Sequence, residues 1–152
     1  MNYQIFLGLG SNLNDRSKIL EMAREDIGNT IGKITQTSAV IETAPWGGIE
    51  QPNYLNQVIE VHTPFFPLKI LSLMQQIEQH AGRIRKEKWG SRTLDIDLLY
   101  YENWHFHTPN LVVPHPFIAE RDFVLSPLVE IAPDFIHPVY KKSSLELLKN
   151  LG

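Results

Sequence analysis

The chain has no cysteine and no long apolar run, and both absences narrow what it can be. Without cysteine, disulfides, thiolate metal ligands and a cysteine nucleophile are excluded, so any catalysis uses oxygen and nitrogen side chains or a bound metal. No stretch is long and apolar enough to span a bilayer, and the N-terminus lacks the basic start and cleavage site of a secretory signal. We therefore expect a cytoplasmic protein.

The chain also lacks a strong excess of charge of either sign. Its net charge of −3 does not attract nucleic acid or an anionic membrane, so we expect neither as a partner. The local charge is different, because five of the 14 basic residues fall within ten positions: Arg83, Arg85, Lys86, Lys88 and Arg92. This cluster predicts attraction for a small polyanion. With 152 residues, the chain is the size of one domain, which we place at 1–152.

Two common phosphate-binding motifs are missing. The chain has no Gly-x4-Gly-Lys-Ser/Thr loop, so any ATP binding must proceed without one. Gly8-x-Gly10 follows an apolar run, but Leu13 stands where a dinucleotide motif needs its third glycine. We therefore interpret Gly8 and Gly10 as part of an ordinary turn between a strand and a helix.

The hydrophobic pattern predicts an α+β fold. Strands are expected at 3–7, 34–43 and 54–62, and a fourth carries Asp95 and Asp97. Helices are expected from a cap at Asn14 or Asp15 to Gly28, and at 67–81, 121–131 and 143–148. The order strand, helix, strand, strand, helix, strand is that of a ferredoxin-like α/β sandwich with a mainly antiparallel sheet and helices packed on it.

Asp95 and Asp97 are the first candidates for a functional site. Side chains two residues apart in a strand share a face, so both carboxylates lie opposite Leu94, Ile96 and Leu98. An isolated Asp-x-Asp is usually the polar face of an edge strand. Aspartate is disfavoured in strands, however, and this pair follows a basic cluster, so a magnesium site for phosphates is the stronger interpretation.

A second set of polar residues is less specific. Tyr54 and Asn56 share one strand face, and an amide there can read the edge of a heterocycle by paired hydrogen bonds, although an ordinary polar face explains them equally well. His115 lies in Val-Pro-His-Pro, shortly before Arg121 and Phe123, and taken alone it is most simply a structural residue.

Four segments together resemble the 6-hydroxymethyl-7,8-dihydropterin pyrophosphokinases of folate biosynthesis: LGLGSNL at 7–13, NYLNQVIE at 53–60, RIRKEKWGSRTLDIDLL at 83–99, and VPHP with RDFVLSPLVEIAP within 113–133. The resemblance covers essentially the whole chain. It implies an enzyme that transfers a pyrophosphoryl group from ATP to the hydroxymethyl oxygen of the reduced pterin and releases AMP. It also implies two Mg²⁺ ions bound alongside ATP. Nothing in the sequence suggests more than a monomer, so we expect one.

The resemblance implies residue roles as well. Asp95 and Asp97 would hold the two magnesium ions, and Arg83 and Arg92 would stabilise charge on the transferred phosphates. Positions that contact ATP in the family are matched by Gln75, Glu78, Arg85, Trp89, Leu98, His115 and Arg121. Positions of the pterin pocket are matched by Thr43, Pro45, Trp46, Tyr54, Asn56 and Phe123. The chain departs from the family pattern at Asn110, Val112 and Pro116, which bears on ATP affinity.

Two rival functions use the same fold. An RNA-binding module also combines such a sheet with aromatic and basic residues, but the RNA-recognition aromatic motifs are absent and the two aspartates would repel a nucleic acid backbone. A non-catalytic nucleotide or metal sensor would keep all of the polar groups, so only turnover distinguishes it from an enzyme.

The predicted role of Arg83 is testable by substitution. We expect Arg83→Ala to slow turnover while ATP binding changes little, because the guanidinium would act on charge that develops in the transition state. Steady-state rates and equilibrium ATP titration of the variant provide the measurement. An equal loss in ATP binding would place Arg83 in recognition of the ground state.

Overall fold

The computed structural model describes residues 2–12, 15–44, 53–85 and 94–152, with the backbone alone for 83–85. The sheet and its first two helices are formed, in chain order, by β1 (Tyr3–Ser11), α1 (Arg16–Thr30), β2 (Lys33–Thr37), β3 (Ile41–Thr43), β4 (Tyr54–Thr63), α2 (Pro67–Arg85) and β5 (Asp95–Tyr101). The rest comprises β6 (Phe106–His107), β7 (Val112–Val113), the 3₁₀-helix η1 (Ile118–Glu120), α3 (Asp122–Ile131) and α4 (Ser144–Leu151).

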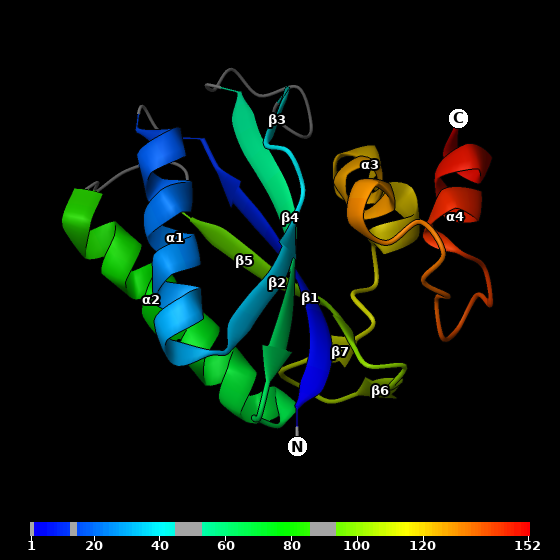
Figure 1. The fold of residues 1–152 in the computed structure, drawn as a ribbon, viewed down its shortest axis with the longest axis horizontal. Coiled ribbons are helices and arrows are strands. Elements are labelled where there is room, and N and C mark those ends of the chain that lie inside the picture. The colour runs from blue at the N-terminus through cyan, green and yellow to red at the C-terminus, as the bar shows by residue number, and fades with distance from the viewer. Residues whose placement is uncertain (1, 13–14, 45–52, 86–93) are drawn as a thin grey trace.

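The main sheet has the order β2-β4-β1-β5, with β3 added beside β4, and all of its pairs are antiparallel. This is the strand order of a ferredoxin-like fold, and the predicted α+β class is confirmed. Figure 1 shows α1 and α2 on one side of the sheet and α3 and α4 on the other. The small β6-β7 hairpin lies near the N-terminal end of β1 (Figure 1).

Alternation along the strands gives the sheet two apolar faces. Ile5, Leu7 and Leu9 of β1 join the cluster formed with α1 and α2, whereas Phe6 joins the cluster formed with α3 and α4. The register between β1 and β5 shifts after Phe6, which pairs with Tyr100, while Leu7 pairs with Leu98. This bulge adds one residue to β5 after the two aspartates. From there on, the alternation of the β5 side chains between the two sheet faces is shifted by one position.

Two strand predictions were wrong. β1 continues through Gly8 and Gly10 to Ser11, so the two glycines lie inside a strand and not in a turn. The strand predicted at 34–43 is two strands, because the chain breaks at Ser38. The Ser38 N–H still donates to Val58 O at 2.9 Å, but the Val58 N–H donates to the Ser38 hydroxyl at 3.0 Å, so a side chain replaces one backbone bond of the ladder there.

The helices also differ at their ends. α1 runs past Gly28 to Thr30, and the side chain of Asp15 does not cap it. α2 runs past Gly82 to Arg85, since burial of Ala81 on its inner side outweighs the low helix propensity of one glycine. α4 begins one residue later than predicted, because Ser143 is its cap and exchanges two hydrogen bonds with Glu146.

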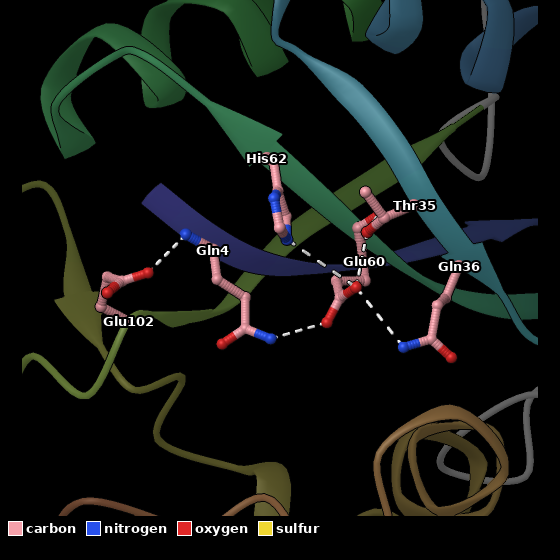
Figure 2. A network of polar contacts seen from close by, with 6 residues as sticks. All are labelled: Gln4, Thr35, Gln36, Glu60, His62 and Glu102. Carbon is pink, nitrogen blue, oxygen red and sulfur yellow. Dashed lines mark hydrogen bonds and ion pairs between the residues drawn. The ribbon is translucent and has the colours of Figure 1, made fainter. Parts of the chain in front are cut away.

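One buried carboxylate connects three strands. Glu60 of β4 is 7% exposed, and its oxygens accept hydrogen bonds from Gln4 Nε2 of β1 at 2.6 Å and from Thr35 Oγ1 of β2. Gln36 Nε2 adds a longer bond of 3.4 Å, and His62 Nε2 lies 3.9 Å away. Figure 2 shows these groups converging on Glu60 from both neighbouring strands. Burial opposes ionisation, but the hydrogen bonds prevail and hold the pKa of Glu60 below its ordinary value of 4.5.

We expect Glu60→Gln to lower the free energy of unfolding by about 1–3 kcal/mol at neutral pH, because one of the donors loses its charged acceptor. A carboxylate whose pKa is lowered in the folded state stabilises it above the unfolded pKa, and this contribution is lost as pH falls through the folded pKa. Urea denaturation at neutral pH and below pH 4 measures both effects. Glu25→Gln, on the exposed side of α1, is the control. A penalty that does not diminish in acid would contradict this role.

Candidate functional site

The candidate site is a cavity of about 470 Å³ at the end of the sheet where β3 ends and β4 begins. Its floor is the sheet face that also packs against α3, and its far wall is the chain from His115 to Val124. The residues that line it come from five elements and the connections between them: Gly8, Leu9, Gly10, Thr43, Ala44, Tyr54, Asn56, Gln57, Val58, Asp95, Asp97, His115, Phe117, Arg121, Phe123 and Val124. Eight of the predicted site residues are among them.

Two glycines of β1 form the centre of the floor. Gly10 pairs with Asp95 on one side and Asn56 on the other, and Gly8 pairs with Asp97 and Val58. The strand between the carboxylates and the amide therefore contributes no side chain at either position. This leaves a backbone surface across which a flat molecule can lie, with an amide at one end and two carboxylates at the other.

The amide end is fixed by a short hydrogen bond. Asn56 Nδ2 donates to Thr43 Oγ1 at 2.6 Å, from β4 to β3. Because the Nδ2 atom is used in this way, Asn56 Oδ1 is turned toward Gly10, where a Cβ atom would lie 3.2 Å from it. The rings of Tyr54 and Phe123 line the same part of the cavity. The arrangement offers a hydrogen-bond acceptor between apolar walls, which suits the edge of a heterocycle.

At the other end, Asp95 and Asp97 project from β5 into the cavity. The backbone N–H of Ile96, between them, donates to Glu78 Oε2 of α2 at 2.8 Å. Glu78 therefore holds the outer edge of β5 and fixes the strand that carries both carboxylates. Burial confirms the predicted alternation, since Leu94, Ile96 and Leu98 are buried in the α1 and α2 cluster.

The donor set at this end fits a metal that arrives with a substrate. Among the described residues, no three His, Cys, Asp or Glu side chains are placed to hold a metal ion together. Magnesium usually takes only one or two protein carboxylates and completes its shell with water and substrate phosphates. Two aspartates with glycines as cross-strand neighbours suit that use, whereas a resident ion enclosed by protein ligands would need more donors.

His115 is held beside Asp97 in a defined tautomer. Its backbone N–H donates to Leu99 O at 3.0 Å, and its Nδ1 accepts from the Phe117 N–H at 3.2 Å. The proton of the neutral ring is therefore on Nε2, which lies 3.8 Å from Asp97 Oδ1. Burial lowers the pKa of His115, with Asp97 opposing the shift and Arg121 adding to it, so the ring is neutral at pH 7 and presents an N–H donor to the cavity.

Arg121 supplies a cation on the far wall. Its guanidinium carbon lies 5.1 Å from the ring centroid of Phe117 and 5.6 Å from that of Phe123. Two aromatic faces thus hold a group that is always charged and suited to phosphate oxygens. Phe117 was missed by the sequence reasoning. An aromatic two residues after His115, in a segment broken by prolines, was the available signal.

Several predicted ATP-contacting residues lie away from this cavity. Gln75 is exposed on α2, and Glu78 is engaged with the edge of β5. The Leu98 side chain is buried on the opposite sheet face, so only its backbone is available to a ligand on the cavity side. The remaining predicted residues fall outside the described residues or side chains: Arg83, Arg85, Trp89, Arg92, Pro45 and Trp46.

The two glycines give a matched test of the floor. In Gly10→Ala the new Cβ would lie 3.2 Å from Asn56 Oδ1, whereas in Gly8→Ala it would meet Leu99 at an ordinary 3.6 Å. We expect Gly10→Ala to shift the NMR signals of the Asn56 side-chain NH₂, because the amide must move by a few tenths of an ångström. Gly8→Ala should leave them nearly unchanged. Equal shifts in the two variants would show that Gly10 does not set the position of Asn56.

Comparison with known proteins gives one consistent family. The family model described as 7,8-dihydro-6-hydroxymethylpterin-pyrophosphokinase (HPPK) matches residues 6–133. A 2-amino-4-hydroxy-6-hydroxymethyldihydropteridine pyrophosphokinase of Aquifex aeolicus is 41% identical over 91% of this chain and 86% of its own length. The protein of the same description from Bacillus subtilis is 40% identical over 86% of this chain and 79% of its own.

Solved structures agree on the fold. The wild-type HPPK-DHPS of Plasmodium falciparum superimposes with a TM-score of 0.82 over 99% of this chain at 16% identity. This chain spans 45% of that longer protein, and 43% of an HPPK-DHPS chain solved in complex with substrates. The match to the family model, together with relatives above 40% identity over most of their length, shows that this chain belongs to the 7,8-dihydro-6-hydroxymethylpterin-pyrophosphokinase family.

Proposed function

We propose that this chain transfers the pyrophosphoryl group of ATP to the hydroxymethyl oxygen of 6-hydroxymethyl-7,8-dihydropterin, giving AMP and the pterin diphosphate for folate biosynthesis. The row Asp95, Gly10, Asn56 across three adjacent strands is the observation that carries the proposal. It puts groups suited to phosphates and groups suited to a heterocycle in one cavity, separated by a bare strand. Family membership supports the same reaction.

The pterin would lie over Gly10 with its polar edge toward β3 and β4. Asn56 Oδ1 is turned to the cavity and can accept a hydrogen bond from an amino or ring N–H, and Thr43 keeps the amide in that orientation. Aromatic stacking contributes about 0.5–1.5 kcal/mol per contact beyond burial, so hydrogen bonds supply most of the discrimination between heterocycles. Tyr54 and Phe123 supply apolar walls, and Pro45 and Trp46 belong to the same pocket in this proposal.

The triphosphate would lie at the β5 end of the row. Arg121 is placed to pair with phosphate oxygens, and the Nε2–H of His115 is placed to donate to one. The proposal adds Gln75, Glu78, Arg85, Trp89 and the backbone of Leu98 on the ATP side. Arg83 and Arg92 would act on the phosphates during transfer. Such a site works mainly by alignment and charge stabilisation, which account for most of the catalysis of phosphoryl transfer.

Magnesium is part of the proposal, with Asp95 and Asp97 as its protein ligands. Two Mg²⁺ ions bound with ATP would neutralise phosphate charge and polarise the phosphorus that is attacked. The aspartates would hold the positive charge of the ions beside β5. Gly8 and Gly10 would lie between these ions and the Asn56 amide that binds the pterin.

The proposal includes a cellular setting and an oligomeric state. A cytoplasmic monomer agrees with the absence of cysteine and with the modest net charge. Among the described residues, no helix is both long and apolar enough to cross a bilayer.

The decisive experiment measures AMP release from ATP and Mg²⁺ with and without 6-hydroxymethyl-7,8-dihydropterin. We expect pterin-dependent AMP from the wild-type chain and a loss of about 100-fold or more in Asp97→Asn, the scale of removing one preorganised electrostatic contact. Asp134→Asn removes a carboxylate on the exposed surface and serves as the control. Omitting Mg²⁺ should abolish the wild-type rate.

Other outcomes point to the rival functions. A folded chain that binds ATP and releases no AMP would be a nucleotide sensor on the same fold. Pterin-dependent AMP that persists in Asp97→Asn would overturn the metal assignment and leave the reaction standing.

A further inference from the structure

We propose that Arg16 is a positioning residue for the pterin side of the cavity, because its guanidinium ties together the ends of β3 and β4. The inference rests on the proposed function for the identity of the ligand. Arg16 is the first residue of α1, and Figure 1 shows that end of α1 at the same end of the molecule as β3 and the start of β4. It does not line the cavity itself.

The contacts of Arg16 converge on two adjacent positions of the sheet. Its Nη1 lies 2.9 Å from Glu42 Oε2 and donates to the backbone oxygen of Asn53 at 2.6 Å. Glu42 directly precedes Thr43, and Asn53 directly precedes Tyr54, which is the cross-strand partner of Thr43. One guanidinium nitrogen therefore bridges the two strands at the last pair before the cavity.

Helix electrostatics do not explain a cation at this place. The N-terminus of a helix carries a partial positive charge, so a positive side chain in the first turn is unfavourable there. The first turn of α1 has no acidic residue, and the side chain of Asp15 does not cap the helix. The contacts of Arg16 with β3 and β4 offset this cost, which indicates that the residue serves the sheet and not the helix.

β3 depends on such a contact because it is short. It has three residues, and among the described strands it pairs with β4 alone. The segment before it is held separately, since the Ala39 N–H donates to the carboxylate of Glu130 at 3.0 and 3.1 Å. Loss of Arg16 would therefore loosen the cavity end of β3 and leave the other end in place.

The consequence falls on the bond between Thr43 and Asn56. Thr43 is the last residue of β3, and its hydroxyl orients the Asn56 amide at 2.6 Å. A looser Thr43 lets that amide rotate, so pterin binding weakens. Asp95 and Asp97 lie on the other side of β1, so ATP binding is unaffected. Partly exposed ion pairs contribute little energy, which limits the expected effect to about three- to fivefold.

The test compares Arg16→Ala with Lys18→Ala, which removes the same charge from an exposed position on the same helix. In AMP release, we expect the KM for 6-hydroxymethyl-7,8-dihydropterin to rise about three- to fivefold in Arg16→Ala, with the KM for ATP and kcat within twofold of wild type. Arg16→Lys should restore part of the loss, because an ammonium can still pair with Glu42.

A second measurement does not depend on the reaction. Amide hydrogen exchange over residues 41–43 should accelerate in Arg16→Ala and not in Lys18→Ala, whether or not the chain turns over pterin. Faster exchange without any wild-type activity would refute the proposed function and keep the positioning role. Unchanged exchange, equal rises in both KM values, or an equal effect of Lys18→Ala would overturn the inference.

Discussion

The site depends on a constraint in the central strand, which must carry no side chain at two positions that face the cavity. β1 lies between the strand with the aspartates and the strand with the amide, so a side chain at Gly8 or Gly10 would stand between the two ends of the site. Glycine weakens a strand by itself. Here the opposite face compensates, because Leu7 and Leu9 are buried against α1 and α2. One face of β1 is apolar, and the other carries Phe6 in the core with α3 and α4 but no side chain at Gly8 and Gly10.

Several functional groups at the cavity are oriented by a hydrogen bond to another part of the fold. Glu78 holds the backbone between the two aspartates, and Thr43 holds the amide of Asn56. His115 is fixed by its bonds to the main chain of Leu99 and Phe117. These supporting bonds come from α2, β3, β5 and the segment before η1, so the described part of the fold provides a preorganised site. Preorganisation of this kind reduces the reorganisation that a bound substrate would otherwise require.

The sequence predicted local patterns well and missed contacts between distant segments. The shared face of Asp95 and Asp97 follows from the period of a strand, and the fold class follows from the order of elements. Gly8 and Gly10 were misread as a turn because glycine is usually a strand breaker, and their value depends on neighbours in β4 and β5 that no local window contains. The extension of α2 past Gly82 has the same cause, because tertiary packing outweighed propensity. The bridge made by Arg16 has no local signature, and the local signal for Phe117 was only its place two residues after His115.

Charge at the cavity explains why a nucleotide would need a divalent cation here. Among its described lining residues, the two aspartates face one permanent cation, Arg121, and His115 is neutral at pH 7 because burial lowers its pKa. This part of the cavity is therefore net negative and would repel a bare triphosphate. In the proposed magnesium complex the contact with the metal would be attractive, since the aspartates would bind it and His115 would still offer an N–H to a phosphate oxygen. Under the proposed function, the same two carboxylates on one strand would disfavour free nucleotide and favour its magnesium complex.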